Sequence, residues 1–221
     1  MNDLTPVPFE RLHAGPAGRN PDRFPVIRTA KLVFPDGEYP CVLRDISGSA
    51  LRVKLYGSPP PPAHASFFLE FGDGDRFEVS LIWCHDGQAG LAFAEANNLL
   101  SVIGERGRFP KRAIRIAIDL PARIRSPGGM VDVVIRDLSH QGAQIECPQL
   151  LAVDQPLRLA IPALGDVYAK VRWRTHPLYG IAFVETFRFE KIAAMSADLH
   201  ALSQAWRDGQ PGGCGTAGLA A

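Results

Sequence analysis

Two stretches of this chain, 92 residues apart, carry nearly the same pattern of residues. Residues 30–46 (AKLVFPDGEYPCVLRDI) align without a gap with residues 122–138 (ARIRSPGGMVDVVIRDL). At an offset of 90, residues 81–95 align with residues 171–185, and both stretches hold Trp, Gly and Phe at matching positions. Because such self-similarity marks a duplicated structural unit, the sequence predicts two copies of one domain.

Each copy has the pattern of short β-strands. The segments expected as strands in the second copy are rich in β-branched and apolar residues, and turn-forming residues separate them. A small antiparallel barrel or sandwich fits this pattern, and a barrel would remove the exposed edges of such short strands. The expected strands are Met130–Leu138, Ala143–Cys147, Pro156–Ile161, Val167–Arg174 and Tyr179–Val184.

The hydrophobic period changes after the second copy. Over residues 187–206 the apolar positions recur at helical spacing, which predicts an amphipathic helix packed on the second barrel. The first copy has only a short counterpart at residues 97–103. The helix face expected to be buried consists of Phe189, Ile192, Ala193, Ser196, Leu199, Leu202 and Trp206.

Composition places the chain among globular proteins. It has 221 residues, 46% hydrophobic and 21% charged, and a net charge of +1, which argues against a protein that coats duplex nucleic acid. No uncharged apolar run reaches the roughly 18 residues that cross a bilayer, and no signal peptide is readable. We therefore expect a cytoplasmic protein without membrane insertion. The predicted divisions are a flexible N-terminal arm (1–18), a first domain (19–103), a second domain (104–206) and a disordered tail (207–221).

Residues for catalysis or metal binding are not apparent. The four cysteines form no Cys-x-x-Cys pair, and no histidine stands at metal-ligand spacing. Cys41, Cys84 and Cys147 are expected to be reduced core residues, whereas Cys214 lies in the Gly-rich tail. Neither a nucleophile elbow nor a paired acid and base is present. The sequence thus predicts a protein that is not an enzyme, with no catalytic residue, metal or cofactor.

Two polar motifs follow each other in the second copy. A basic arm, residues 105–113, contains Arg108-x-x-x-Arg112, and Asp137-x-Ser139-x-x-Gly142 begins 25 residues after Arg112. Taken alone, the first motif is typical of a solvated linker and the second of a turn that ends a strand. In this order on a strand-rich domain, they resemble the paired signature of the PilZ domain, a bacterial receptor module for cyclic di-GMP.

The resemblance implies a fold and a site. It implies a mainly β protein with two six-stranded antiparallel barrels, the second carrying the C-terminal helix. Arg108 and Arg112 would clamp guanine and phosphate, and Asp137, Ser139 and Gly142 would form the floor of the site on the barrel. A planar Arg fork suits phosphate oxygens and the guanine N7/O6 edge, and a carboxylate accepts from guanine N–H groups. Further candidate ligand-binding residues are Arg106, Arg115 and His140.

The first copy departs from this signature. It keeps Asp45 and Ser47, but Ala50 stands where the second copy has Gly142. Arg19 and Arg23 are four residues apart, yet in the ungapped alignment Arg23 matches Arg115 instead of an arginine of the signature. We therefore expect the first domain to carry a degenerate site.

Three functions remain open from the sequence. The first is a cyclic di-GMP receptor that signals through contacts with an unidentified effector protein, and the resemblance implies outputs in motility, exopolysaccharide production or virulence. The alternative is a ligand-independent adaptor that docks a flagellar, pilus or polysaccharide-synthase component. A binder of RNA or single-stranded DNA would need aromatic residues among its basic ones, and only Phe109 accompanies the basic arm.

Overall fold

The computed structural model describes residues 23–57, 61, 65–72, 74–95, 112–126 and 128–209. The predicted N-terminal arm, the helix expected at residues 97–103 and residues 210–221 of the predicted tail lie outside these ranges. So do the side chains of Arg19, Arg106, Arg108 and Cys214.

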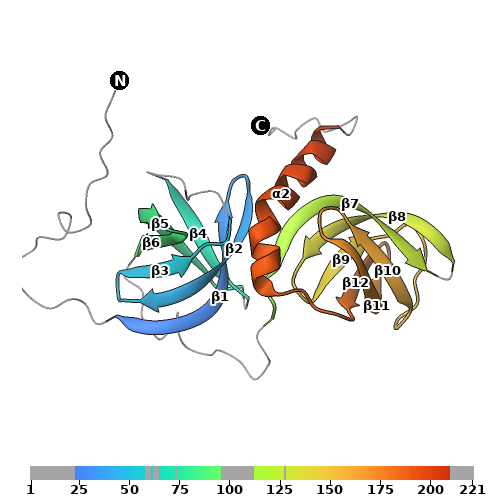
Figure 1. Cartoon of the computed structure of the whole chain (residues 1–221), viewed down its shortest axis with the longest axis horizontal. Coiled ribbons are helices and arrows are strands. Elements are labelled where there is room, and N and C mark those ends of the chain that lie inside the picture. Colours follow the sequence, from blue (N-terminus) through green and yellow to red (C-terminus); the bar gives the residue numbers. More distant parts are fainter. Residues whose placement is uncertain are drawn as a thin grey trace, which may run out of the picture.

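Each copy of the repeat folds into a closed six-stranded antiparallel barrel, which confirms the predicted mainly β fold (Figure 1). The strand order around barrel 1 is β1-β2-β3-β6-β5-β4, and the same circular order recurs in barrel 2. Barrel 1 consists of β1 (Phe24–Phe34), β2 (Gly37–Ile46), β3 (Ala50–Lys54), β4 (Ser66–Phe71), β5 (Arg76–His85) and β6 (Gln88–Phe93). Barrel 2 consists of β7 (Ile116–Ser126), β8 (Gly129–Leu138), β9 (Gly142–Glu146), β10 (Pro156–Ile161), β11 (Gly165–Thr175) and β12 (Leu178–Phe183).

The duplication extends to the irregularities of the strands. The β1–β2 register shifts between Pro25 and Arg28, and β7–β8 shifts at the equivalent place, between Ala117 and Leu120. Further shifts lie next to Asp45 and Asp137, and next to Trp83 and Trp173. Since a bulge bends a strand and re-aims its side chains, both barrels bend at the same positions.

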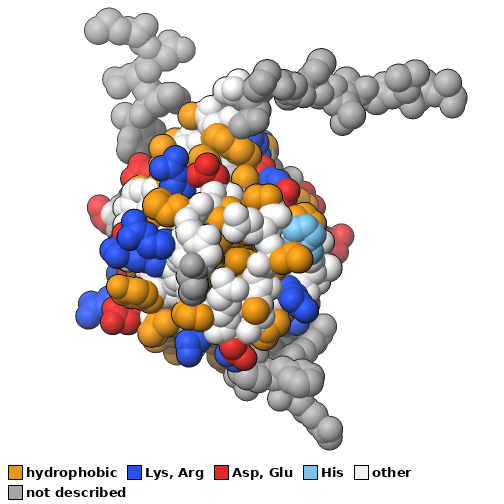
Figure 2. Space-filling view, turned by 90° about the vertical axis from the view of Figure 1, so that its right-hand side faces the viewer, with side chains coloured by type: hydrophobic (Ala, Val, Ile, Leu, Met, Phe, Trp, Pro, Cys, Tyr) orange, Lys and Arg blue, Asp and Glu red, His pale blue; other side chains and the backbone are white. Residues whose placement is uncertain are grey.

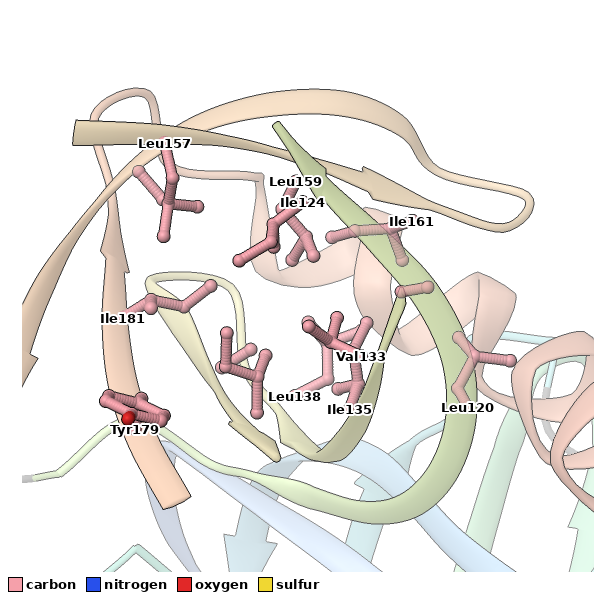
Figure 3. Packing of buried hydrophobic residues seen from close by; sticks show 14 of the residues in the cluster. Leu120, Ile124, Val133, Ile135, Leu138, Leu157, Leu159, Ile161, Tyr179 and Ile181 are labelled. Carbon is pink, nitrogen blue, oxygen red and sulfur yellow. The ribbon is translucent and has the colours of Figure 1, made fainter. Parts of the chain in front are cut away.

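Apolar side chains fill the interior of barrel 2 (Figure 3). Along β7 the buried positions alternate with exposed ones, as expected for a strand with one face on the core. Tyr179 is fully buried, and its hydroxyl donates to the carbonyl oxygen of Gln149 at 3.0 Å. The other residues of this interior cluster come from strands all around the barrel and include Leu120, Ile124, Val133, Ile135, Leu138, Leu157, Leu159, Ile161 and Ile181.

The C-terminal helix α2 (Phe189–Asp208) lies between the two barrels (Figure 1). It packs against β7 of its own barrel and against β2 of barrel 1. The helix was predicted, but its buried face was partly wrong, because Leu202 is 40% exposed whereas His200 and Ser203 are buried. The reason is that the helix makes a polar contact with each barrel: His200 accepts from the backbone N–H of Glu38 in barrel 1, and Ser203 accepts from the amide of Asp119 in barrel 2.

One cysteine prediction was also wrong. Cys41 and Cys147 are buried, but Cys84 is exposed near the end of β5. The register shift between Leu81 and Trp83 precedes it, and the last two residues of β5 are both exposed. No helix in the described part of the chain is both long and apolar enough to cross a membrane.

Candidate ligand-binding site

The turn that follows β8 holds the second motif. Ser139 is 1% exposed, and its hydroxyl donates to the carbonyl oxygen of Gly142 at 3.0 Å. Ser139 Oγ also accepts from the backbone N–H of Gly142 at 3.2 Å and of Gln141 at 3.3 Å. The hydroxyl is thus used inside the turn, so Ser139 fixes the backbone that carries the neighbouring motif residues.

Gly142 is required by a close approach of two strands. A Cβ added there would overlap the carbonyl oxygen of Ile181 on β12, which pairs with β9. The backbone of Gly142 is not in the left-handed region, so space alone explains the glycine.

The carboxylate of Asp137 lies at the edge of this turn and is partly exposed. Its Oδ1 accepts from the Arg115 guanidinium and, at 3.2 Å, from the backbone N–H of Gln144. The structure therefore brings together Arg115 and Asp137, which are 22 residues apart in the sequence. Charge-assisted hydrogen bonds of this kind hold a carboxylate in one orientation.

Arg112 lies at the entrance to β7, three residues before Arg115. Its side chain is exposed and makes no hydrogen bond or ion pair with the residues that the structure describes. Its backbone lies against barrel 1, because a Cβ on Gly72 would overlap the Arg112 carbonyl oxygen. The guanidinium is thus available on a backbone that is held in place.

His140 lies in the same turn, between the motif and α2. Its ring contacts the ring of Phe189 edge-on, with centroids 6.3 Å apart, and its Nδ1 is buried without a hydrogen-bond partner among the described residues. Burial lowers the pKa of His140, and the nearby Glu190 opposes that shift only in part. A neutral imidazole with an unused nitrogen can give or receive one hydrogen bond.

Barrel 1 has the same turn but a different carboxylate environment. Ser47 accepts from the amide of Ala50 at 3.1 Å and donates to its carbonyl oxygen at 3.0 Å, so Ala in place of Gly does not disturb the turn. Asp45, however, is held by Arg52, whose Nε and Nη2 lie 2.6 and 2.5 Å from Oδ2. Arg23 adds a contact of 3.4 Å to Oδ1, matching the Arg115–Asp137 pair of barrel 2.

The two sites differ in the residue that stands opposite the motif aspartate on the neighbouring strand. Arg52 pairs with Asp45 between β2 and β3, and Gln144 occupies the same position opposite Asp137. The Asp45 side chain is 11% exposed and that of Asp137 is 22% exposed. Sequence reasoning overlooked Gln144, although the repeat alignment shows the exchange of Arg for Gln.

Of two hollows in the described part of the molecule, one adjoins the motif and the other does not. A hollow of about 700 Å³, lined by residues such as Pro148, Pro177 and Trp206, is at the end of barrel 2 away from the motif, since β9 runs from Gly142 towards Pro148. A smaller groove of about 380 Å³ separates β1 and β2 from the start of α2, and Phe189 connects it to His140. The smaller groove is the one that adjoins the motif.

Among the described residues, no cluster of three or more His, Cys, Asp or Glu side chains is placed to hold a metal ion. The candidate site is instead composed of arginines, one carboxylate and backbone groups. Such a site suits an anionic ligand with hydrogen-bonding ring edges.

Comparison with known proteins agrees with this architecture. The PilZ domain family model matches residues 18–101 and, a second time, residues 106–193. No curated protein matches the sequence. Among solved structures, the chain is similar to the PlzA protein of Borreliella burgdorferi in complex with c-di-GMP, at 18% identity and a TM-score of 0.31, with 80% of this chain and 88% of that chain covered.

Two more solved structures show a similarity of the same order. YcgR of Escherichia coli in complex with c-di-GMP is 14% identical, with a TM-score of 0.31 and coverage of 82% of this chain and 86% of that chain. The inhibitor of motility MotI/DgrA of Bacillus subtilis is 13% identical, with a TM-score of 0.33 and coverage of 80% and 92%. The family assignment rests on the two model matches, which together span more than half of the sequence. This chain is a tandem member of the PilZ domain family.

Proposed function

We propose that this protein is a receptor for cyclic di-GMP, that barrel 2 binds the ligand, and that the bound state is read by a partner protein. The observation that carries the proposal is the difference between the two barrels. In barrel 2 the motif aspartate stands opposite Gln144, and Arg112 has no polar partner among the described residues, whereas in barrel 1 Arg52 binds Asp45.

The chemistry of the site matches the ligand. Cyclic di-GMP has two phosphate charges and two guanines. The Arg108 and Arg112 guanidinium groups would bind phosphate oxygens or the N7/O6 edge of guanine, since both present paired acceptors. Asp137 would accept from guanine N–H groups on Oδ2, while Arg115 and the Gln144 backbone N–H hold the carboxylate through Oδ1.

The remaining motif residues act on the backbone in this proposal. Ser139 is buried and its hydroxyl is used within the turn, and Gly142 admits the neighbouring strand. In this proposal, Ser139 and Gly142 fix the backbone that forms the floor of the site. His140 stands at the edge of the site and Arg106 precedes the signature arginines, so both are proposed as secondary contacts; Arg19, Arg23, Asp45 and Ser47 belong to the degenerate site of barrel 1.

A nucleic-acid function is poorly supported. On the face of barrel 2 that points away from barrel 1, basic side chains stand singly or in small groups among acidic and apolar ones (Figure 2). Binding along a nucleic-acid backbone uses a continuous basic groove with stacked aromatic residues. The net charge of +1 also argues against binding along a nucleic-acid backbone.

The direct test is calorimetric titration of the full chain with cyclic di-GMP, with GTP as the control ligand. We expect saturable binding of cyclic di-GMP and none of GTP. Absence of both heat and thermal stabilisation at high ligand concentration would reject the receptor function. The ligand-independent adaptor would then be the better interpretation, and its partner would be sought among motility and exopolysaccharide components.

The first mutational prediction concerns Arg112. Arg112→Ala should lose charge-assisted hydrogen bonds of about 1.5–3 kcal/mol, roughly a 10- to 150-fold loss of affinity, with the melting temperature unchanged. Arg123→Ala is the matched control, because Arg123 is an exposed arginine of β7 paired with Asp132. Arg23→Ala should also leave affinity unchanged; an equal loss from Arg23→Ala and Arg112→Ala would mean that the binding barrel is wrongly assigned.

A further inference from the structure

The segment that leads into barrel 2, residues 112–117, is held by side chains of barrel 1. The carbonyl oxygen of Arg115 accepts from the Lys31 ammonium group at 3.0 Å. Two residues further on, the backbone N–H of Ala117 donates to Glu38 Oε2 at 2.7 Å. Both bonds join the two barrels, across 84 and 79 residues of sequence.

Lys31 and Glu38 are themselves fixed. Lys31 is 8% exposed, and its Nζ lies 2.8 Å from Glu38 Oε2 and 3.1 Å from Glu70 Oε1. A buried ammonium group between two carboxylates is neutralised without any help from barrel 2. The third N–H of the Lys31 ammonium group therefore remains to donate to the Arg115 carbonyl oxygen.

A third contact fixes the beginning of the segment. Gly72, at the end of β4, lies so close to the segment that an added Cβ would overlap the Arg112 carbonyl oxygen. The same Cβ would lie 3.7 Å from Cδ1 of Ile114, a buried residue. Residues 112, 115 and 117 are thus each fixed by a different residue of barrel 1.

We infer that Lys31, Glu38 and Gly72 form a clamp through which barrel 1 positions the ligand-binding arginines of barrel 2. The inference rests on the proposed function, because Arg112 and Arg115 matter here as ligand-site residues. Barrel 1 then has a role in binding although its own site is degenerate. The clamp residues do not touch the ligand; they are positioning residues.

The physical basis is the cost of ordering. An arginine on a loose segment loses backbone and side-chain freedom when it binds, and this loss weakens affinity. The clamp holds the backbone from Arg112 to Ala117 before the ligand arrives. Arg115 is thereby held by both barrels, because its carbonyl oxygen accepts from Lys31 of barrel 1 and its guanidinium donates to Asp137 of barrel 2.

The test compares two glycine substitutions in barrel 1 of the full chain. Gly72→Ala forces the Arg112 backbone away without changing any charge. Gly48→Ala is the matched control, because an added Cβ there meets nothing within 4 Å and the backbone is not left-handed. We expect Gly72→Ala to weaken binding of cyclic di-GMP by about 2- to 12-fold, the range for one freed side chain, and Gly48→Ala to leave it unchanged.

A combination with Arg112→Ala separates positioning from general damage to the fold. If Gly72→Ala acts through Arg112, it should cause no further loss of affinity in an Arg112→Ala background. The same loss in both backgrounds would overturn the inference, as would equal affinities of the Gly72→Ala and Gly48→Ala variants.

A second readout needs no ligand. The Ala117 amide should be protected from hydrogen exchange in the unaltered chain, lose protection in Glu38→Ala, and regain it in Glu38→Gln, whose amide oxygen can still accept. Failure of the unaltered chain to bind cyclic di-GMP would reject the proposed function and the positioning role together. Binding without protection of Ala117, or without rescue by Glu38→Gln, would reject the clamp alone.

Discussion

At the scale of single residues, the two barrels differ beside the motif aspartate, where Gln144 of barrel 2 stands in the position of Arg52 of barrel 1. Both side chains stand opposite the motif aspartate on the neighbouring strand. The arginine donates from two nitrogens to one oxygen of Asp45, so that oxygen is already satisfied. Glutamine leaves Asp137 with a backbone donor and Arg115, and more of the carboxylate exposed.

This difference predicts the effect of an exchange. Gln144→Arg should let a guanidinium bind Asp137 as in barrel 1 and weaken cyclic di-GMP binding about 10-fold, the loss of one charge-assisted hydrogen bond. Arg52→Gln is the control and should not alter binding to barrel 2. Calorimetry of both variants checks this, and tighter binding by Gln144→Arg would show that the added charge serves the phosphates instead.

At the scale of secondary-structure elements, a tryptophan and a glycine form a repeated pair. Trp83 and Trp173 follow the register shift of β5 and β11, opposite Gly90 and Gly180 on the next strand. A Cβ on either glycine would overlap the indole of the paired tryptophan. The bulge and the glycine thus allow the large ring to lie flat on the barrel wall.

Filling the space between Gly180 and the Trp173 indole should destabilise barrel 2. Gly180→Ala would force Trp173 away and is expected to lower the free energy of unfolding by about 1–3 kcal/mol, as overpacking does. Gly128→Ala is a suitable control, since its Cβ would have Ser126 Oγ at 3.6 Å as its nearest neighbour. Urea unfolding followed by tryptophan fluorescence measures both, and equal stabilities would contradict the account.

At the scale of the whole molecule, α2 joins the barrels through a buried histidine. His200 Nε2 lies 2.9 Å from the backbone nitrogen and 2.8 Å from the carbonyl oxygen of Glu38, so it accepts in one tautomer and donates in the other. Its ring also contacts the Tyr39 ring and fills the space beside Gly37. Burial lowers the pKa of His200, although Glu38 and Asp36 oppose the shift; Arg207 acts in the same direction as burial.

The lowered pKa makes stability depend on pH. Between the lowered pKa of His200 and the unfolded value of about 6.5, the unfolded chain binds more protons than the folded one. The free energy of unfolding should therefore rise with pH across that window and level off above it. His140 contributes with the same sign.

Urea unfolding between pH 5.5 and pH 7.5, a range of about 2 units around the histidine value, tests this dependence. The His200→Gln variant should keep a hydrogen bond to Glu38 and show a smaller slope than the unaltered chain. Identical slopes would mean that His200 does not titrate on unfolding in this range.

Most of the architecture was predictable because it depends on local pattern. The strand alternation and the helical period of α2 are each encoded within a few neighbouring residues, and the repeat follows from aligning two such stretches of the chain. Strand ends shifted by one or two residues, as for β9, where Gly142 begins the strand instead of Ala143. The helix face was partly wrong because a helix that contacts two barrels does not show a single apolar stripe.

The candidate site was predictable only as a set of residues. Arg112, Asp137, Ser139 and Gly142 could be named from the order of two motifs, and Arg115 from its nearness to them. The burial of Ser139 and the ion pair of Asp137 with Arg115 could not be predicted. They depend on the fold of the turn and on the pairing of β8 with β9.

The sequence by itself determined the duplication, the strand-rich class and the motif-bearing copy, because repeated patterns, periodicity and motif order can all be read along the chain. Only the tertiary structure decided that Arg52 binds Asp45 and that side chains of barrel 1 bind the backbone at Arg115 and Ala117. Lys31 and Arg115 are 84 residues apart, and no local pattern connects them. Their contact arises where the two barrels meet: β2 contacts β7 and α2 packs on both strands, and there the buried ammonium group lies within hydrogen-bond distance of the backbone carbonyl.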